Sequence, residues 1–209
     1  MVRKIAMSLM VLAVFGFIFA LKSFAAITGS QHDFSSESWN PSGEICLVCH
    51  APHNAISTIA PLWNHAITTS TFTIYSSPSL EATVGQPSAS SKTCLSCHDG
   101  TLGLDPSGTT DTTITGSANL GTDISNDHPV SFTYDSDLAT ADGTLFDPTV
   151  QTVPSLGGKT IAQGMLIDNK LECGSCHDVH NNKGDAPTSP KLLVVNNEGS
   201  ALCLTCHNK

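Results

Sequence analysis

Four copies of the pattern Cys-x-x-Cys-His carry the chemistry of this sequence. Two thiols one helical turn apart can form thioether bonds with the two vinyl groups of a haem, and the adjacent histidine can bind its iron from the proximal side. We therefore expect four covalently bound c-type haems (haem c, iron). They would be attached through Cys46, Cys49, Cys94, Cys97, Cys173, Cys176, Cys203 and Cys206, with His50, His98, His177 and His207 as proximal ligands.

Zinc is the alternative occupant, because paired Cys-x-x-Cys units also build structural zinc sites. Zinc does not require a histidine directly after each pair, whereas haem attachment does. All 8 cysteines and 4 of the 9 histidines fall in the four motifs, which favours haem.

The motifs lie in two similar halves, about 27–115 and 116–209. Each half has a lone histidine, then Cys-x-x-Cys-His-x-x-His-Asn, then Cys-Leu-(Ser/Thr)-Cys-His, an order that indicates an internal duplication. The repeated histidines outside the motifs are the candidate distal iron ligands: His32, His53, His128 and His180. Because His53 and His180 follow their proximal histidines by three residues and share a helical face with them, we expect each to bind a neighbouring haem.

His65 has no counterpart in the second half. It is either a substitute for one of the four distal ligands or an ordinary polar residue. Beyond residue 26 the sequence has one methionine, Met165, so at most one haem could have the His/Met ligation that raises reduction potential.

Residues 1–26 read as a secretory signal peptide: Arg3 and Lys4, an apolar run over 5–21, and small residues before position 27. An uncleaved membrane anchor is the alternative. The mature chain, 27–209, would form one tetrahaem domain without a membrane span, exported to the cell surface or outside, or retained in the periplasm. It would keep 6 basic and 18 acidic side chains, a net charge of −12 that makes nucleic acid an improbable partner.

The elements that must position these motifs are short. We expect a multihaem cytochrome c fold of mostly irregular coil, with short helices at the Cys-x-x-Cys-His motifs, a few short strands and a core formed by the four haems. Alternation over 71–75 and 130–134 favours strands, and Asp142-Gly143 and Gly157-Gly158 favour turns. A further helix is expected near 164–171.

Several flanking stretches resemble secreted multihaem cytochromes with doubled haem motifs, in particular the tetrahaem OmcE-like cytochromes of metal-reducing bacteria. The stretches are Ser-Gln-His-Asp-Phe-Ser (30–35), Cys-His-Ala-Pro-His-Asn (49–54), Pro-Leu-Trp-Asn (61–64), His-Pro-Val-Ser-Phe (128–132), Cys-His-Asp-Val-His-Asn (176–181) and Leu-Cys-Leu-Thr-Cys-His (202–207). The resemblance implies a homopolymeric extracellular filament in which one distal histidine comes from the neighbouring subunit. His32, close to the expected mature N-terminus, is the candidate.

Electron transfer without catalysis is the function that these features favour, with redox partner cytochromes and extracellular acceptors such as metal oxides. A monomeric periplasmic electron shuttle is the alternative. A multihaem reductase would need a haem with an open distal position, and five histidines outside the motifs for four irons argue against one.

Overall fold

The computed structural model describes residues 27–56 and 61–209. The predicted signal peptide, 1–26, lies outside the described residues. Within the described residues, no helix is long and apolar enough to cross a membrane.

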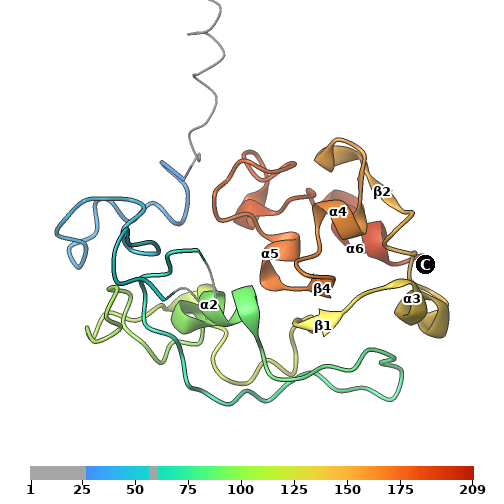
Figure 1. The fold of residues 1–209 in the computed structure, drawn as a ribbon, viewed down its shortest axis with the longest axis horizontal. Helices are drawn as coiled ribbons and strands as arrows, with labels where there is room; N and C mark the ends of the chain where they lie inside the picture. The colour runs from blue at the N-terminus through green and yellow to red at the C-terminus, as the bar shows by residue number, and fades with distance from the viewer. Residues whose placement is uncertain (1–26, 57–60) are drawn as a thin grey trace, which may run out of the picture.

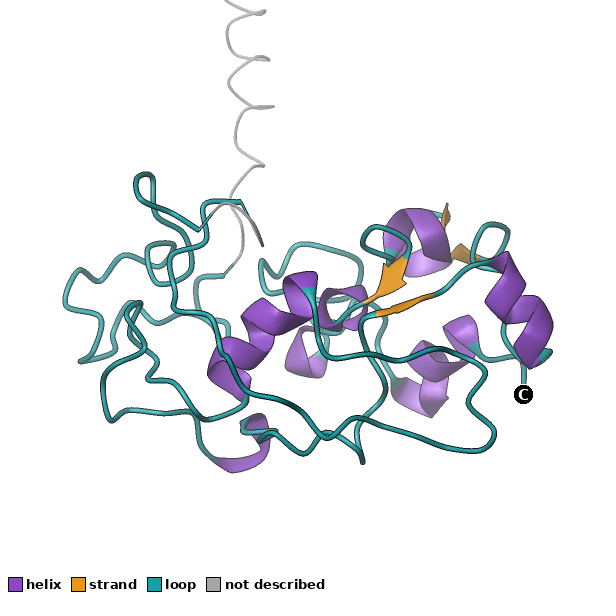
Figure 2. Ribbon diagram, turned by 60° about the horizontal axis from the view of Figure 1, so that its bottom comes forward, coloured by secondary structure: helices purple, strands orange, loops and turns teal. Residues whose placement is uncertain are grey.

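Loops and turns make up most of the described chain, and the regular elements are short (Figure 2). The α-helices are α2 (Ala89–His98), α3 (Ser136–Asp142), α4 (Ile161–Gly164), α5 (Cys173–Cys176) and α6 (Ala201–Cys206). The 3₁₀ turns are η1 (Gly116–Ala118), η2 (Pro154–Leu156), η3 (Pro190–Leu192) and η4 (Glu198–Ser200). The strands β1 (Phe132–Thr133) and β4 (Lys170–Leu171) pair antiparallel, as do β2 (Thr152–Val153) and β3 (Lys159–Thr160). This composition is compatible with a cytochrome c and confirms a mostly irregular fold.

Three of the four motifs lie on helices, as predicted: α2, α5 and α6. The first motif does not form a helix. It makes a single turn in which the Cys46 carbonyl accepts hydrogen bonds from the Cys49 and His50 amides, at 3.2 and 2.8 Å. A one-turn segment flanked by loops has few helical hydrogen bonds to gain beyond the first, which explains why no longer helix follows.

The predicted strands are shorter than the alternating sequence suggested. Phe132–Thr133 is a strand, but 71–75 makes only one bridge, between Thr73 and Asp123. The helix expected near 164–171 is wrong, since α4 ends at Gly164 and a turn with Asp168 and Asn169 at positive φ leads into β4. Aspartate and asparagine tolerate this left-handed conformation, which suits a tight hairpin turn.

Aspartates followed two positions later by serine or threonine fix the loops. In six such pairs the carboxylate accepts hydrogen bonds from both the backbone amide and the hydroxyl of the second residue. The six aspartates are Asp33, Asp99, Asp105, Asp123, Asp142 and Asp147. These side-chain bonds replace the backbone ladders that regular elements would supply.

The two halves lie side by side along the long axis and have unequal cores (Figure 1). The second half contains a cluster of buried apolar side chains that includes Phe132, Tyr134, Ile161, Met165 and Val194. Among the described residues, the first half contributes only Phe72 and Leu95 to a second cluster, which is completed by Ile124 of the second half and has Ile74 packed against it. An ordinary side-chain core therefore exists beside the predicted haem core, but only in the second half.

Helices α2 and α5 pack against each other where the halves meet, at the centre of the molecule (Figure 1). Ser91 on α2 accepts a hydrogen bond from the Cys173 amide at the start of α5, at 3.0 Å. This contact brings the second and third motifs together.

Candidate haem-binding site

Each motif has the same local backbone geometry. The carbonyl of the first cysteine accepts a hydrogen bond from the histidine amide in the first, third and fourth motifs, at 2.8, 3.0 and 2.9 Å, and the second motif lies within α2. One helical turn places residues three and four apart on the same face. The two thiols and the histidine of each motif therefore lie on one side of their turn, as haem attachment requires.

Backbone carbonyls orient three of the four motif histidines. The Nδ1 atoms of His50, His98 and His177 donate to the carbonyls of Pro61, Ala118 and Lys191, at 2.8, 2.8 and 2.7 Å. A histidine that ligates a metal usually donates its other ring N–H to an acceptor, which fixes the tautomer and the ring orientation. Each of these rings keeps Nε2 for an iron.

The loops that supply these carbonyls are equivalent in the two halves. The Leu62 carbonyl accepts from the Ala51 amide at 2.8 Å, and the Leu192 carbonyl accepts from the Asp178 amide at 2.9 Å. Leu62 and Leu192 both have positive φ, 55° and 59°. Residues 61–64 therefore correspond to 191–194, a match that the sequences Pro-Leu-Trp-Asn and Lys-Leu-Leu-Val do not reveal.

Three pairs of histidine rings face each other across the motifs. The ring centroids of His32 and His98 are 6.1 Å apart, those of His50 and His180 are 6.2 Å apart, and those of His128 and His207 are 6.4 Å apart. Each pair joins one predicted proximal ligand to one predicted distal ligand.

These distances fit an iron held between two imidazoles. Metal–imidazole bonds of about 2 Å put the two ligating nitrogens about 4 Å apart and the ring centroids roughly 6 Å apart. His32 and His128, at equivalent places in the two halves, each face the second motif of their own half. His180 instead crosses to the first motif of the other half.

His32 is a neutral ring in this environment. Burial, together with the nearby His98 and His177, lowers its pKa to about 4. Its buried Nδ1 has no hydrogen-bond partner. An uncharged imidazole is the form that binds iron, so the ring suits a ligand of the haem at His98 in its own chain.

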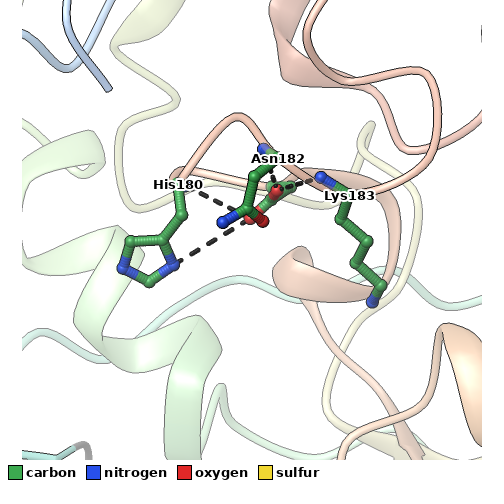
Figure 3. A network of polar contacts seen from close by, with 4 residues as sticks. His180, Asn182 and Lys183 are labelled. Carbon is green, nitrogen blue, oxygen red and sulfur yellow. Dashed lines mark hydrogen bonds and ion pairs between the residues drawn. The ribbon is translucent and has the colours of Figure 1, made fainter. Parts of the chain in front are cut away.

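Asp178 holds the loop that carries His180. Figure 3 shows His180, Asn182 and Lys183 around this carboxylate, which accepts from their three backbone amides at 3.2, 2.7 and 2.8 Å. The His180 Nδ1 lies 4.0 Å from Asp178 Oδ1. The distal candidate of the first haem is thus positioned by a carboxylate next to the third motif.

The equivalent loop in the first half lacks this anchor, because Ala51 stands where Asp178 stands. His53 is exposed, and within the described residues its ring faces no other histidine ring. The same holds for His177. Repeat symmetry would pair His53 with His177, as His180 pairs with His50, but the described structure does not bring them together.

His65 is buried at 1% exposure beside the second motif, 3.6 Å from the Cys97 Sγ atom. Its Nδ1 lies 2.7 Å from the Ala66 carbonyl and its Nε2 lies 2.8 Å from the Gly103 carbonyl. Both ring nitrogens are engaged by backbone, an arrangement that matches an ordinary polar residue.

The positions of the thiols show which motifs are neighbours in space. Cys97 lies close enough to Cys49 for their charges to interact, the Cys94 and Cys173 thiols are hydrogen-bonded, and Cys176 lies near Cys203. The spatial order of the motifs is therefore first, second, third, fourth. Cys46 in the first motif and Cys203 in the fourth are exposed.

Burial raises the pKa of the second cysteine in every motif, to about 11 in Cys49 and Cys176 and to about 12 in Cys97 and Cys206. The pKa of Cys173, the first cysteine of the third motif, is instead lowered by its hydrogen bond with Cys94. Among the described residues, no three histidine, cysteine or acidic side chains converge as a metal site would need. The donor sets fit haem, whose iron takes only two ligands from the protein.

Apolar side chains exposed around the motifs are a second feature that a haem would explain. Six large hydrophobic side chains of the described chain are exposed, and five of them lie in a motif, next to one in sequence, or in a segment hydrogen-bonded to one. These five are Leu47, Leu62, Leu120, Val179 and Leu204. These side chains are distributed over all four motifs, and a porphyrin bound at each motif would cover apolar surface there.

Residues 167–209 match the family model described as Doubled CXXCH motif. No curated protein matches the chain. The matched segment contains the third and fourth motifs, and the first and second motifs repeat its pattern upstream. The paired motifs indicate covalently bound c-type haem, and with it a multihaem c-type cytochrome that transfers electrons.

Proposed function

We propose that this chain is an exported tetrahaem c-type cytochrome that conducts electrons along a line of four bis-histidine haems. The observation that carries the proposal is the order of the four motifs, in which thiols of successive motifs lie within range of electrostatic interaction and Cys94 and Cys173 are in hydrogen-bond contact. Haems attached in this order would lie edge to edge, and such haems pass electrons without any catalytic group.

Facing histidines support the bis-histidine part of the proposal. His180, His32 and His128 would complete the haems at His50, His98 and His207, and His53 is the remaining distal candidate for the haem at His177. The haem supplies the redox-active iron, and the protein supplies the ligands, the covalent attachment and the spacing.

Two measurements test this proposal together: the number of haems per chain, and whether every iron has both axial positions occupied by protein ligands. Intact-mass measurement on the purified protein should give four haems per chain and a mature start near residue 27. Carbon monoxide added to the reduced protein should leave the spectrum of all four haems nearly unchanged. Fewer haems, or one haem that binds carbon monoxide strongly, would favour a reductase with an open iron instead.

We further propose that the chains join end to end as an extracellular filament that delivers electrons to external acceptors. Cys46 and Leu47 in the first motif, and Cys203 and Leu204 in the fourth, are exposed. The end haems would therefore be the ones that meet another chain or a redox partner.

The ligand shared between subunits has two candidates in this chain. His32, the donor predicted from the sequence, faces His98 of its own chain, so it would reach another subunit only if the N-terminal segments were exchanged. His53 is exposed and free of ring contacts in the described residues, and it could bind the haem at His177 of a second subunit.

Electron microscopy of material sheared from the producing cells tests assembly. Regular filaments that stain for haem would support the proposed electron-conducting filament. Compact monomers confined to the periplasm would support the alternative, a soluble electron shuttle.

A further inference from the structure

Glu172 is a buried carboxylate between the second and third motifs. It directly precedes α5 and Cys173, and its exposure is 1%. Ser91 and Ser131, which contact it, are 0% and 8% exposed. Water therefore has little access to this group.

Two hydroxyl groups from different parts of the chain point at one of its oxygens. Oε2 accepts hydrogen bonds from Ser91 of α2 and, at 2.8 Å, from Ser131 beside β1. The Glu172 amide donates to Ser175 at 2.9 Å, which fixes the backbone on the other side. Hydrogen bonds donated to a carboxylate stabilise its charged form.

The other carboxylate oxygen of Glu172 accepts no hydrogen bond. Oε1 is buried without a hydrogen-bond partner, and no lysine or arginine in the described chain forms an ion pair with Glu172. Burying a carboxylate without a cation costs several kcal/mol. A carboxylate buried at such a cost brings a negative charge to the place where α2 and α5 meet.

The surroundings of Glu172 are the attachment points of two haems. Ser91 lies one helical turn before Cys94 on α2, and the Cys94 thiol is hydrogen-bonded to that of Cys173. The Glu172 carboxylate therefore lies where the second and third haems of the proposed cytochrome would come closest.

We propose that the Glu172 carboxylate lowers the reduction potentials of the second and third haems relative to the two end haems. Each reduction adds one electron to an iron, and a fixed negative charge nearby opposes that added charge. The inference rests on the proposed tetrahaem function and adds a residue that sets the reduction potentials along the row of haems.

The expected effect is large because the charge is buried. A unit charge on the order of 10 Å away in a medium of effective dielectric constant about 20 changes an equilibrium constant about tenfold. Tenfold corresponds to about 59 mV for a one-electron couple. An exposed carboxylate is screened by water and salt and should do far less.

Spectroelectrochemical titration of the haem-loaded protein tests the proposal with Glu172→Gln. Glutamine keeps the shape and removes the charge, so two of the four one-electron steps should shift upwards by about tenfold each in equilibrium constant. Glu198→Gln is the matched control, since Glu198 is exposed and also precedes a motif helix, α6. Glu172→Asp keeps the charge and should leave the potentials near those of the unmodified protein.

Equal shifts in the two glutamine variants, or no shift in Glu172→Gln, would overturn the proposal. If Glu172→Gln does not fold, the redox-difference infrared spectrum of the unmodified protein decides. A carboxylate band that moves in Ser131→Ala supports a charged Glu172, whereas a protonated carboxyl band, or no band sensitive to Ser131, contradicts it. A protein with fewer than four haems would refute the tetrahaem function itself, an outcome distinct from an unshifted titration with all four haems present.

Discussion

At the scale of single residues, the positions of the histidines decide how the irons would be completed. The rings of His180 and His50 are 17° from parallel, and Asp178 fixes the loop of His180. The equivalent His53 has neither a facing ring in the described chain nor a carboxylate anchor. One side chain in the repeat is thus preorganised, and its counterpart is not.

Replacing His180 with methionine should change one haem. A His/Met haem has a higher reduction potential than a bis-histidine haem, so one of the four steps in a redox titration should rise while the others stay. His53→Met is the control at the equivalent position and should leave the haem at His50 unaltered. Four unchanged potentials in His180→Met would show that His180 does not bind iron.

The proximal histidines can be predicted directly from the sequence, because each follows its cysteines without a gap. The distal candidates also follow from the repeat, but the ring that each one faces does not. That His32 faces His98 and that His180 crosses to His50 depends on how the halves pack, which no local pattern records. The carbonyls of Pro61 and Lys191, which orient the proximal rings, are likewise invisible in sequence because any residue has one.

At the scale of elements, the loops keep their shape through aspartate side chains rather than through helices or strands. Asp105 is the clearest case: its carboxylate accepts from the amides of Ser107, Thr109 and Thr110 at 3.1, 3.1 and 2.8 Å. Burial raises its pKa, but the hydrogen bonds from Ser107 and Thr110 outweigh burial and lower it. The loop it organises accepts the His65 ring at Gly103.

Acid should loosen these loops. A carboxylate whose pKa is lowered by folding stabilises the fold above its unfolded pKa, near 3.9, and this contribution is lost as the pH falls through the folded value. Asp33, Asp105, Asp123, Asp142 and Asp147 all have lowered pKa values, so protection from hydrogen exchange in their loops should fall below about pH 4.

Asp105→Asn should loosen residues 103–112 already at neutral pH, because an amide oxygen is a weaker acceptor than a carboxylate. Asp111→Asn is a control of the same sequence pattern, since Asp111 is also followed two positions later by a threonine but is exposed. Equal exchange rates in the two variants would contradict the role of Asp105.

Element prediction failed where these turns replace regular structure. The Asp-x-(Ser/Thr) pattern was present in the sequence and could have located six of the fixed turns. Alternation over 71–75 did identify the buried Phe72, but it could not show that only Thr73 would find a partner strand. Pairing depends on a segment 50 residues away, around Asp123.

At the scale of the whole molecule, the two halves share a motif order but not a core. The apolar cluster of the second half includes twelve buried residues, and Ala82 and Val84 of the first half pack against it. The first half has little apolar packing of its own in the described chain. Its stability should therefore depend more on bound haem.

A variant in which all eight motif cysteines are replaced by serine tests this dependence. Without covalent haem, amides of the second half, such as those around β1 and β4, should keep measurable protection from hydrogen exchange, while residues 27–75 lose it. Equal loss in both halves would show that the cluster around Ile161 cannot hold the second half alone.

His32→Ala tests the assembly of whole molecules. If the N-terminal segments are exchanged between subunits, this variant should keep covalent haem yet form no filaments. If His32 serves its own chain, filaments should persist while the haem at His98 gains an open position that binds carbon monoxide. His53→Ala separates the second donor in the same two measurements.

The contact between Cys94 and Cys173 constrains the order of maturation. In the folded chain these two thiols touch, and both are only partly exposed. In an oxidising compartment, such a pair can close into a disulfide and thereby lose both attachment points. We therefore expect haem to be attached to the second and third motifs before α2 packs against α5, so that haem supply competes with folding where the two halves meet. Cys46 and Cys203 are exposed and should accept haem even after folding.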